Sequence, residues 1–195
     1  MMQARYKLPI ASPGAILRDE RKLGTLLGIE AEKSTSHGQL VPDGLVNEVV
    51  KQWLSRRDSR FVFDGYPRSA GQATALDVML AERNTPLDVV LSLEADYETI
   101  RRRVERRMTC SDCGGVVSVG LHVVSAQAPC PFCGGKLSRR QDDTPETLES
   151  RMREYASKTE PLISYYRDRG LLRAVNAAQS PEVVFNAIAE ILEVP

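Results

Sequence analysis

Apolar residues along this chain alternate between short runs and longer stretches with helical spacing. The runs at 60–64 and 87–93 are rich in β-branched and aromatic residues and are bounded by turn residues, which predicts buried strands. Residues 171–175 are a third strand candidate. Apolar periodicity and start signals predict helices over 42–56, 69–83, 96–107, 144–169 and 181–192. This order predicts an α/β fold, with a parallel sheet flanked by helices.

The segment from Met108 to Arg140 breaks this rhythm, because it is rich in glycine, valine and cysteine, and it predicts a small β insert. It holds all four cysteines, in the pairs Cys110-x-x-Cys113 and Cys130-x-x-Cys133. This spacing lets two tight turns present four thiolates to one zinc ion, and four thiolates leave no position for water. The sequence therefore predicts a structural zinc site, with two disulfides or an iron site as alternatives.

Composition narrows the class of protein. A chain of 195 residues can bury one core with an insert. Its 26 lysines and arginines balance 26 aspartates and glutamates, so no overall field draws it to nucleic acid or to an anionic membrane. We find no apolar run long enough for a membrane span and no apolar signal core after Met1, so we expect a cytoplasmic protein.

Charged residues follow the first predicted strand directly, in Asp64-Gly65-Tyr66-Pro67-Arg68. Ligands of parallel sheets bind at the carboxyl ends of strands, where an arginine can grip phosphate oxygens and an aspartate can hold a magnesium-bound water. An ordinary strand-to-turn junction is the alternative interpretation.

A cluster of arginines lies on the helix before the insert, where Arg102 and Arg106 share a face. Such a cluster is usually a solvated surface. Beyond the insert stand further charged residues: Arg140, Asp142, Asp143 and Arg151. Charged groups at both ends of an insert that could move are what a lid closing over phosphates requires.

Together these motifs resemble adenylate kinase, in its long form with a zinc-binding lid. The resemblance covers nearly the whole chain. Its motifs, in chain order, are Gly38-Gln39-Leu40-Val41-Pro42-Asp43, the Asp64–Arg68 segment, Arg106-Arg107, the four cysteines, Arg140-Gln141-Asp142-Asp143 and Arg151. It implies a P-loop NTPase-like nucleoside monophosphate kinase fold with a small β zinc-ribbon lid. The implied domains are a core over 1–107 with an AMP-binding segment at about 12–42, a lid over 108–141, and the rest of the core over 142–195.

The resemblance also implies the reaction, which is reversible phosphoryl transfer from ATP to AMP with magnesium, giving two ADP. AMP would be bound by Arg18, Gly65, Arg68 and Gln72. ATP would be bound by Arg102, Arg106 and Arg140. The catalytic set would be Arg68, Arg106, Arg140, Arg151 and Asp64. Zinc would be held by Cys110, Cys113, Cys130 and Cys133. We expect a monomer whose partners are these nucleotides.

The sequence departs from the family in several places. It contains no Gly-x-x-x-x-Gly-Lys-[Ser/Thr] loop, the main cradle for the phosphates of ATP. Pro13 and Ala15 replace a threonine and an aspartate of the family, and Asn176-Ala177 stands where the family has Asp-Gly. We expect the natural protein to begin upstream of Met1, the alternative being a degraded paralogue.

Three functional hypotheses follow from these features. The first is an adenylate kinase, whose activity in these 195 residues would be impaired by the missing loop. The second is a non-catalytic relative that binds AMP. The third is a zinc-ribbon module that binds nucleic acid through the arginine-rich helix, which the balanced charge and the shortage of aromatic residues in the insert disfavour.

Overall fold

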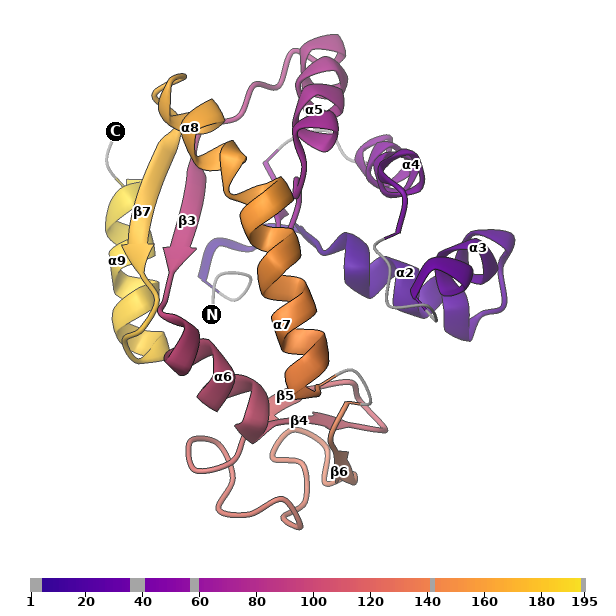
Figure 1. Ribbon diagram of the computed structural model, residues 1–195, viewed down its shortest axis with the longest axis vertical. Helices are drawn as coiled ribbons and strands as arrows, with labels where there is room; N and C mark the ends of the chain where they lie inside the picture. The colour runs from indigo at the N-terminus through magenta and orange to yellow at the C-terminus, as the bar shows by residue number, and fades with distance from the viewer. Residues whose placement is uncertain (1–4, 36–40, 57–59, 141–142, 194–195) are drawn as a thin grey trace. The chain divides into compact units, whose positions relative to one another are not determined.

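The computed structural model describes residues 5–35, 41–56, 60–140 and 143–193 (Figure 1). The chain divides into two compact units. The first unit comprises Met1–Ser92, Glu154–Val175 and Pro181–Pro195. The second unit comprises Leu93–Arg153 and Asn176–Ser180.

In the first unit, strand β1 (Ile10–Ala11) pairs in parallel with strand β2 (Val62–Phe63). Strands β3 (Val90–Glu94) and β7 (Leu172–Asn176), most of whose residues belong to this unit, form a second two-stranded sheet. The described strands of the α/β core thus form two separate pairs rather than one continuous sheet. The helices are α2 (Pro13–Lys22), α3 (Leu26–Thr35), α4 (Asp43–Leu54), α5 (Ala70–Glu82), α8 (Pro161–Arg167) and α9 (Pro181–Glu193).

Local signals explain where these helices begin. Ser69 caps α5, because its side chain accepts a hydrogen bond from the backbone N–H of Gln72. Pro13 and Pro161 stand in the first turns of α2 and α8, where the N–H that proline lacks would have no helical partner. The predicted helices at 42–56, 69–83 and 181–192 are confirmed with small shifts at their ends.

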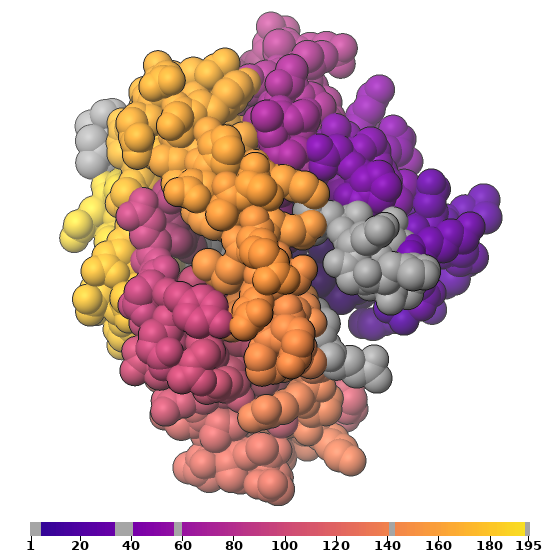
Figure 2. Space-filling view, viewed as in Figure 1, coloured from indigo at the N-terminus to yellow at the C-terminus, as the bar shows by residue number. Residues whose placement is uncertain are grey.

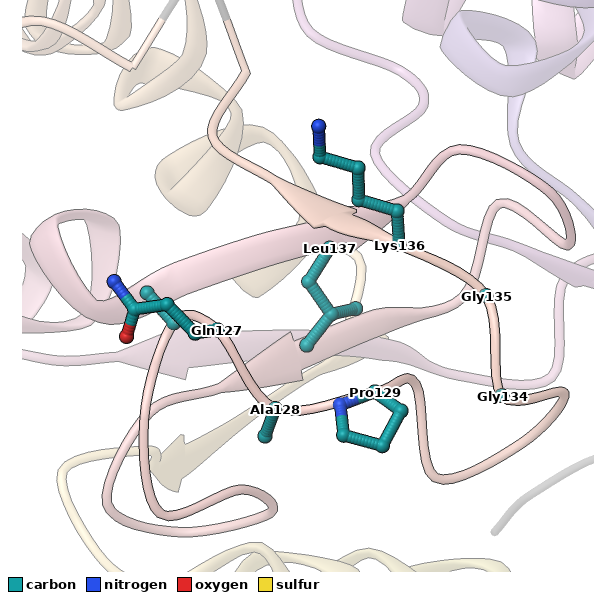
Figure 3. Close-up of a pocket in the computed structure, with 8 residues that line it drawn as sticks. Gln127, Ala128, Pro129, Gly134, Gly135, Lys136 and Leu137 are labelled. Atoms are coloured by element: carbon teal, nitrogen blue, oxygen red, sulfur yellow. The ribbon is translucent and has the colours of Figure 1, made fainter.

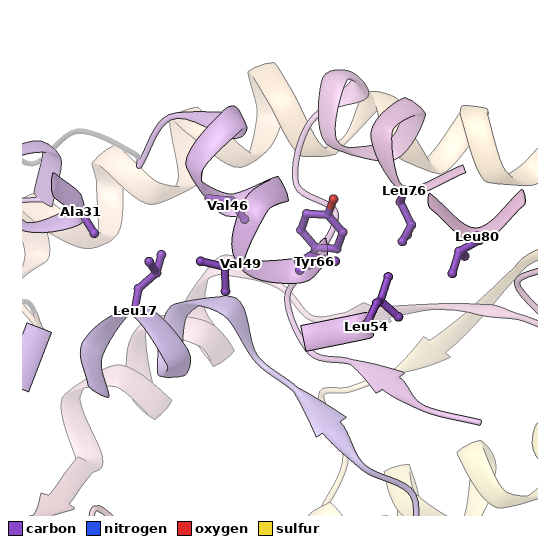
Figure 4. Packing of buried hydrophobic residues seen from close by; sticks show 9 residues of the cluster. Leu17, Ala31, Val46, Val49, Leu54, Tyr66, Leu76 and Leu80 are labelled. Atoms are coloured by element: carbon purple, nitrogen blue, oxygen red, sulfur yellow. The ribbon is translucent and has the colours of Figure 1, made fainter. Parts of the chain in front are cut away.

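The core of the first unit is formed mainly by α2, α4 and α5 (Figure 4). Its fully buried aliphatic side chains include Val50, Leu54 and Leu76. The rings of Trp53, Phe61, Phe63 and Tyr66 adjoin it, with neighbouring centroids 5.1 to 6.0 Å apart. This packing fixes the segment that follows β2, since Tyr66 belongs to both the cluster and that segment.

The second unit consists mainly of helices α6 (Tyr97–Arg106) and α7 (Pro145–Glu154) and a three-stranded sheet. Strand β4 (Arg107–Cys110) lies between β5 (Val116–Ser118) and β6 (Leu137–Ser138), antiparallel to both. A small cluster of buried residues holds this insert together, namely Met108, Cys110, Val117, Cys130 and Leu137. The residues of the insert gather in one mass in the space-filling view (Figure 2). The predicted β insert is therefore confirmed.

The helical stretch predicted over 144–169 is confirmed, but a π-helical turn interrupts its α-helical bonding. Helix α7 ends at Glu154, and a π-helical turn (Tyr155–Thr159) precedes α8. Pro161 has no N–H, and its ring would clash with the carbonyl four residues earlier, so α-helical bonding cannot continue through it. The chain instead makes a wider turn, in which Glu160 N donates to Tyr155 O (2.8 Å).

Across the part of the chain that the structure describes, no helix has both the length and the apolar character that a membrane span demands.

Candidate functional site

The segment Asp64–Arg68 leaves the end of β2 with its backbone anchored. Asp64 N donates to Ala11 O (2.8 Å), which continues the pairing of the two strands, and the Asp64 side chain is exposed. Gly65 adopts φ +71°, in the left-handed region that favours glycine. The carboxylate therefore stands at the carboxyl end of a parallel strand, where the sequence predicts a phosphate ligand.

The Arg68 side chain folds over Gly65. Arg68 Nε donates to Gly65 O (2.8 Å), and a Cβ added at Gly65 would lie 2.6 Å from an Arg68 guanidinium nitrogen. Any larger residue at position 65 would thus displace the guanidinium as well as strain the backbone. Arg68 is exposed, so its remaining N–H groups can reach an anion.

Gln72 lies on the first turn of α5 and is buried. Its Oε1 accepts from the backbone N–H of Arg68 (2.7 Å), and its Nε2 donates to Asp43 Oδ1 (2.7 Å). Asp43 Oδ2 also accepts from Ser69 Oγ (2.5 Å). The structure thus brings together three residues predicted to bind AMP, Gly65, Arg68 and Gln72, and adds Asp43, for which the sequence had suggested no role.

Tyr66 is buried between these residues and α4. Its hydroxyl donates to Asn47 Oδ1 (2.8 Å) and lies 3.3 Å from the backbone carbonyl oxygen of Gln72. Burial raises the pKa of Tyr66 well above its usual value, and the charge of Asp43 raises it further. The tyrosine therefore stays a neutral hydrogen-bond donor that ties the segment to α4.

Arg18, the remaining residue predicted to bind AMP, is exposed on α2. A Cβ added at Gly14 would lie 3.4 Å from Arg18 Nη1, so the guanidinium lies along the start of its own helix. Pro13 is buried at the first position of this helix. Of the predicted motif at 38–43, residues 38–40 lie outside the described residues.

Arg101 and Arg102 both have partners on their own helix, α6. Arg101 is engaged within α6, because its guanidinium pairs with both Glu98 and Glu105. The hydrogen bond from Arg101 lowers the pKa of Glu98. For Arg101 the solvated-surface interpretation therefore holds. Arg102 lies on another part of the helix surface, with Nε 3.4 Å from Glu98 O.

Arg106 is exposed at the end of α6, and Arg140 is half-buried after β6. Their backbones are fixed, since Arg106 O accepts from Val119 N (2.9 Å) and Arg140 O accepts from Asp143 N (3.2 Å). Asp142 of the predicted motif lies outside the described residues. The predicted ring of arginines draws on residues of both units and stays a prediction.

Asp143 forms the most buried ion pair that the described residues contain. Its side chain is 1% exposed, and it accepts two hydrogen bonds from Arg107, one of them from Nε at 2.9 Å. Arg151 Nη1 lies 4.0 Å from the same carboxylate. Arg107 begins β4 and Asp143 precedes α7, so this pair joins the two ends of the insert. The sequence indicated charged groups here but not which of them pair.

The four cysteines converge as predicted. Their sulfur atoms all lie within 4.8 Å of one another, with Sγ–Sγ distances of 3.5 Å for Cys110–Cys133 and 3.8 Å for Cys113–Cys130. Four thiolates around one zinc ion, each about 2.3 Å from the metal, would stand about 3.8 Å apart in a tetrahedron. The donor set and its spacing therefore fit zinc.

Each Cys-x-x-Cys pair closes the same turn. Gly114 N donates to Cys110 O (3.0 Å), Gly134 N donates to Cys130 O (2.8 Å), and both glycines have positive φ. The backbone amide of Cys113 lowers the pKa of Cys110 to about 7, because an N–H group stabilises the thiolate. Although the amide of Gly135 acts in the lowering direction, the neighbouring thiols raise the pKa of Cys133 to about 12.

A hollow of about 550 Å³ lies beside these turns (Figure 3). Leu137 points into it, whereas the amino group of Lys136 points away. Its lining belongs wholly to the insert and contains none of the residues predicted to bind nucleotides: Ala126, Gln127, Ala128, Pro129, Gly134, Gly135, Lys136 and Leu137. We therefore assign it no part in nucleotide binding.

Comparison with known proteins decides the family. The profile of the family described as "ADK: Adenylate kinase" matches residues 1–171. The chain belongs to the adenylate kinase family. An adenylate kinase of Thermodesulfovibrio yellowstonii is 41% identical to it over 191 residues, which are 97% of this chain and 89% of the relative. An adenylate kinase of Archaeoglobus fulgidus is 39% identical, over 97% of this chain and 88% of the relative.

Membership of the adenylate kinase family confirms the resemblance inferred from the ordered motifs. It also confirms the predicted fold class. An adenylate kinase of Desulfitobacterium hafniense is also similar, being 37% identical over 191 residues, which are 97% of this chain and 88% of the relative. The individual site residues stay predictions.

Proposed function

We propose that this protein is an adenylate kinase, which transfers the terminal phosphoryl group of ATP reversibly to AMP and forms two ADP. Membership of the family over residues 1–171 is the observation that supports this proposal most directly. The first unit supports it further, because Gly65, Arg68 and Gln72 are assembled at the carboxyl end of a parallel strand.

AMP would be held by the first unit. Arg68 would grip its phosphate, with Arg18 as a second cation, and the backbone at Gly65 would let the nucleotide approach closely. Gln72 would contact the edge of the base. Because the Arg68 guanidinium already rests against Gly65 O, little side-chain entropy remains to be lost when phosphate binds.

The phosphates of ATP and the transferring group would be neutralised by four arginines of the second unit, Arg102, Arg106, Arg140 and Arg151. Asp64 would hold a magnesium-bound water, for which its exposed carboxylate at the end of β2 is suited. Magnesium would supply neutralising charge to the phosphate oxygens. None of these residues would act as a covalent nucleophile, so catalysis would rest on positioning and charge neutralisation.

The insert over 108–141 would be a lid, and zinc held by its four cysteines would be structural. All four donors are thiols, so a bound zinc ion would keep no position open for water. Two turns of similar backbone geometry, each stabilised by its own glycine, support a rigid metal site.

A coupled assay of ADP formation from ATP and AMP tests the proposal. These 195 residues contain no Gly-x-x-x-x-Gly-Lys-[Ser/Thr] loop, so the chain should be assayed beside one extended with the strand and phosphate-binding loop of a family member. We expect activity at least in the extended chain. In the extended chain, Arg68→Ala should raise the KM for AMP by about 10- to 100-fold, because the phosphate loses hydrogen bonds from a charged group.

Arg169→Ala is the matched control, because Arg169 lies over the ring of Tyr165 (3.6 Å) and has no proposed role in binding nucleotides. It should leave both kinetic constants unchanged. If the 195-residue chain binds AMP but the extended chain shows no turnover, the non-catalytic alternative is favoured. Failure of both chains to bind AMP would refute the kinase proposal.

A further inference from the structure

The amide of Gln72 has one permitted orientation. The backbone N–H of Arg68 is a donor, so the atom that faces it at 2.7 Å must be the amide oxygen. The carboxylate of Asp43 can only accept, so the atom that faces it at 2.7 Å must be the amide nitrogen. Rotating the amide by half a turn would set donor against donor and acceptor against acceptor.

Asp43 is itself fixed by two helices. It is the first residue of α4, and its second oxygen accepts from Ser69 Oγ at the start of α5. A Cβ added at Gly71 would lie 3.2 Å from Asp43 Oδ2, so the carboxylate is packed closely against the backbone of α5. Since Gln72 is only 5% exposed, solvent does little to compete for its amide.

This orientation has chemical consequences for a base. The two bonds use one of the two Nε2 hydrogens and one of the two Oε1 lone pairs, so the amide keeps one further donor and one further acceptor. A 6-aminopurine presents an acceptor, N1, beside an amino donor. A 6-oxopurine presents the reverse, a donor N1–H beside a carbonyl acceptor. A fixed amide suits one pattern, whereas an amide free to rotate suits both.

We propose that Asp43 is a specificity-determining residue, which holds the Gln72 amide in the orientation that accepts a 6-aminopurine monophosphate and rejects a 6-oxopurine monophosphate. This inference rests on the proposed function, since it takes Gln72 as the residue that contacts the base. Asp43 acts through Gln72 and touches no substrate, so it is a positioning residue.

The test is calorimetric titration of the chain with AMP and with IMP. The variants are Asp43→Ala, Asp43→Asn and the control Glu48→Ala, which removes another carboxylate of α4 that bonds to Gln52. We expect Asp43→Ala to reduce the preference for AMP over IMP by about tenfold, the effect of one hydrogen bond to a charged group. Asp43→Asn keeps an acceptor oxygen and should retain most of the preference.

A second readout does not depend on nucleotide binding. The side-chain NH₂ resonances of Gln72 should exchange slowly with solvent in the unaltered chain and in Glu48→Ala, and faster in Asp43→Ala. Slow exchange in Asp43→Ala, or an unchanged preference for AMP, would overturn the role of Asp43 while the kinase proposal stands. Absence of AMP binding by the unaltered chain would overturn both.

Discussion

Replacing Arg107 by leucine should destabilise the second unit strongly. The change would leave the carboxylate of Asp143, whose side chain is 1% exposed, with Arg151 at 4.0 Å as its remaining ion-pair partner among the described residues. Removing one partner of a buried ion pair costs about 3 to 5 kcal/mol. Because the Arg107 side chain is 27% exposed and Arg151 keeps part of the attraction, we expect a loss near the lower end, about 3 kcal/mol.

Hydrogen exchange of the β4 amides measures this loss within the unit concerned, as the free energy of local opening. Asp143→Asn added to Arg107→Leu removes the unpaired charge, so the double variant should recover more than half of the lost stability. Arg101→Leu is the control, because it breaks only exposed ion pairs with Glu98 and Glu105. A loss below about 1 kcal/mol in Arg107→Leu, or a double variant no more stable than the single one, would refute the reasoning.

Three further predictions concern the cysteines, the tyrosine and a helix cap. Cys113→Ser, or a zinc chelator, should lower the melting temperature of the insert and leave AMP binding unchanged; full stability after chelation would contradict a structural zinc. Tyr66→Phe should lower stability by about 1 kcal/mol, measured by urea denaturation and tryptophan fluorescence, because Asn47 loses its buried donor, and an unchanged midpoint would exclude this. Asp96 caps α6 by accepting a hydrogen bond from Thr99 N, and this bond lowers the pKa of Asp96 below its ordinary value of 3.8. The charged cap therefore stabilises the helix above pH 3.8, and this stabilisation is lost as the pH falls through the lowered pKa. The melting-temperature difference between the unaltered chain and Asp96→Ala should thus close in acid, whereas a difference that persists at low pH would disprove the charge effect.

Much of the fold could be predicted because its signals are local. The start of α5 follows from the capping serine at 69, and that of α9 from Pro181. The π-helical turn inside 144–169 could not be predicted, because apolar periodicity continues across it, whereas the effect of Pro161 depends on the carbonyls of the preceding turn. Periodicity alone does not record which backbone groups would clash.

The candidate site likewise has parts that local sequence signals predict and parts that depend on contacts between distant residues. The four cysteines could be predicted because their spacing in sequence sets their spacing in space. The contact of Asp43 with Gln72 could not be predicted, because it spans 29 positions and joins helices whose packing the sequence does not reveal. The pairing of Arg107 with Asp143 likewise joins residues on either side of the whole insert.

The two buried cysteines, Cys110 and Cys130, also belong to the small apolar cluster inside the insert, where they pack with Met108, Val117 and Leu137. A bound zinc ion would draw the four sulfur atoms together in the place where the apolar side chains must close, so metal loading and collapse of the insert would be coupled. By mass action, the concentration of available zinc would then shift the fraction of molecules whose insert is folded. Catalytic capacity would follow the supply of a metal that takes no part in the chemistry.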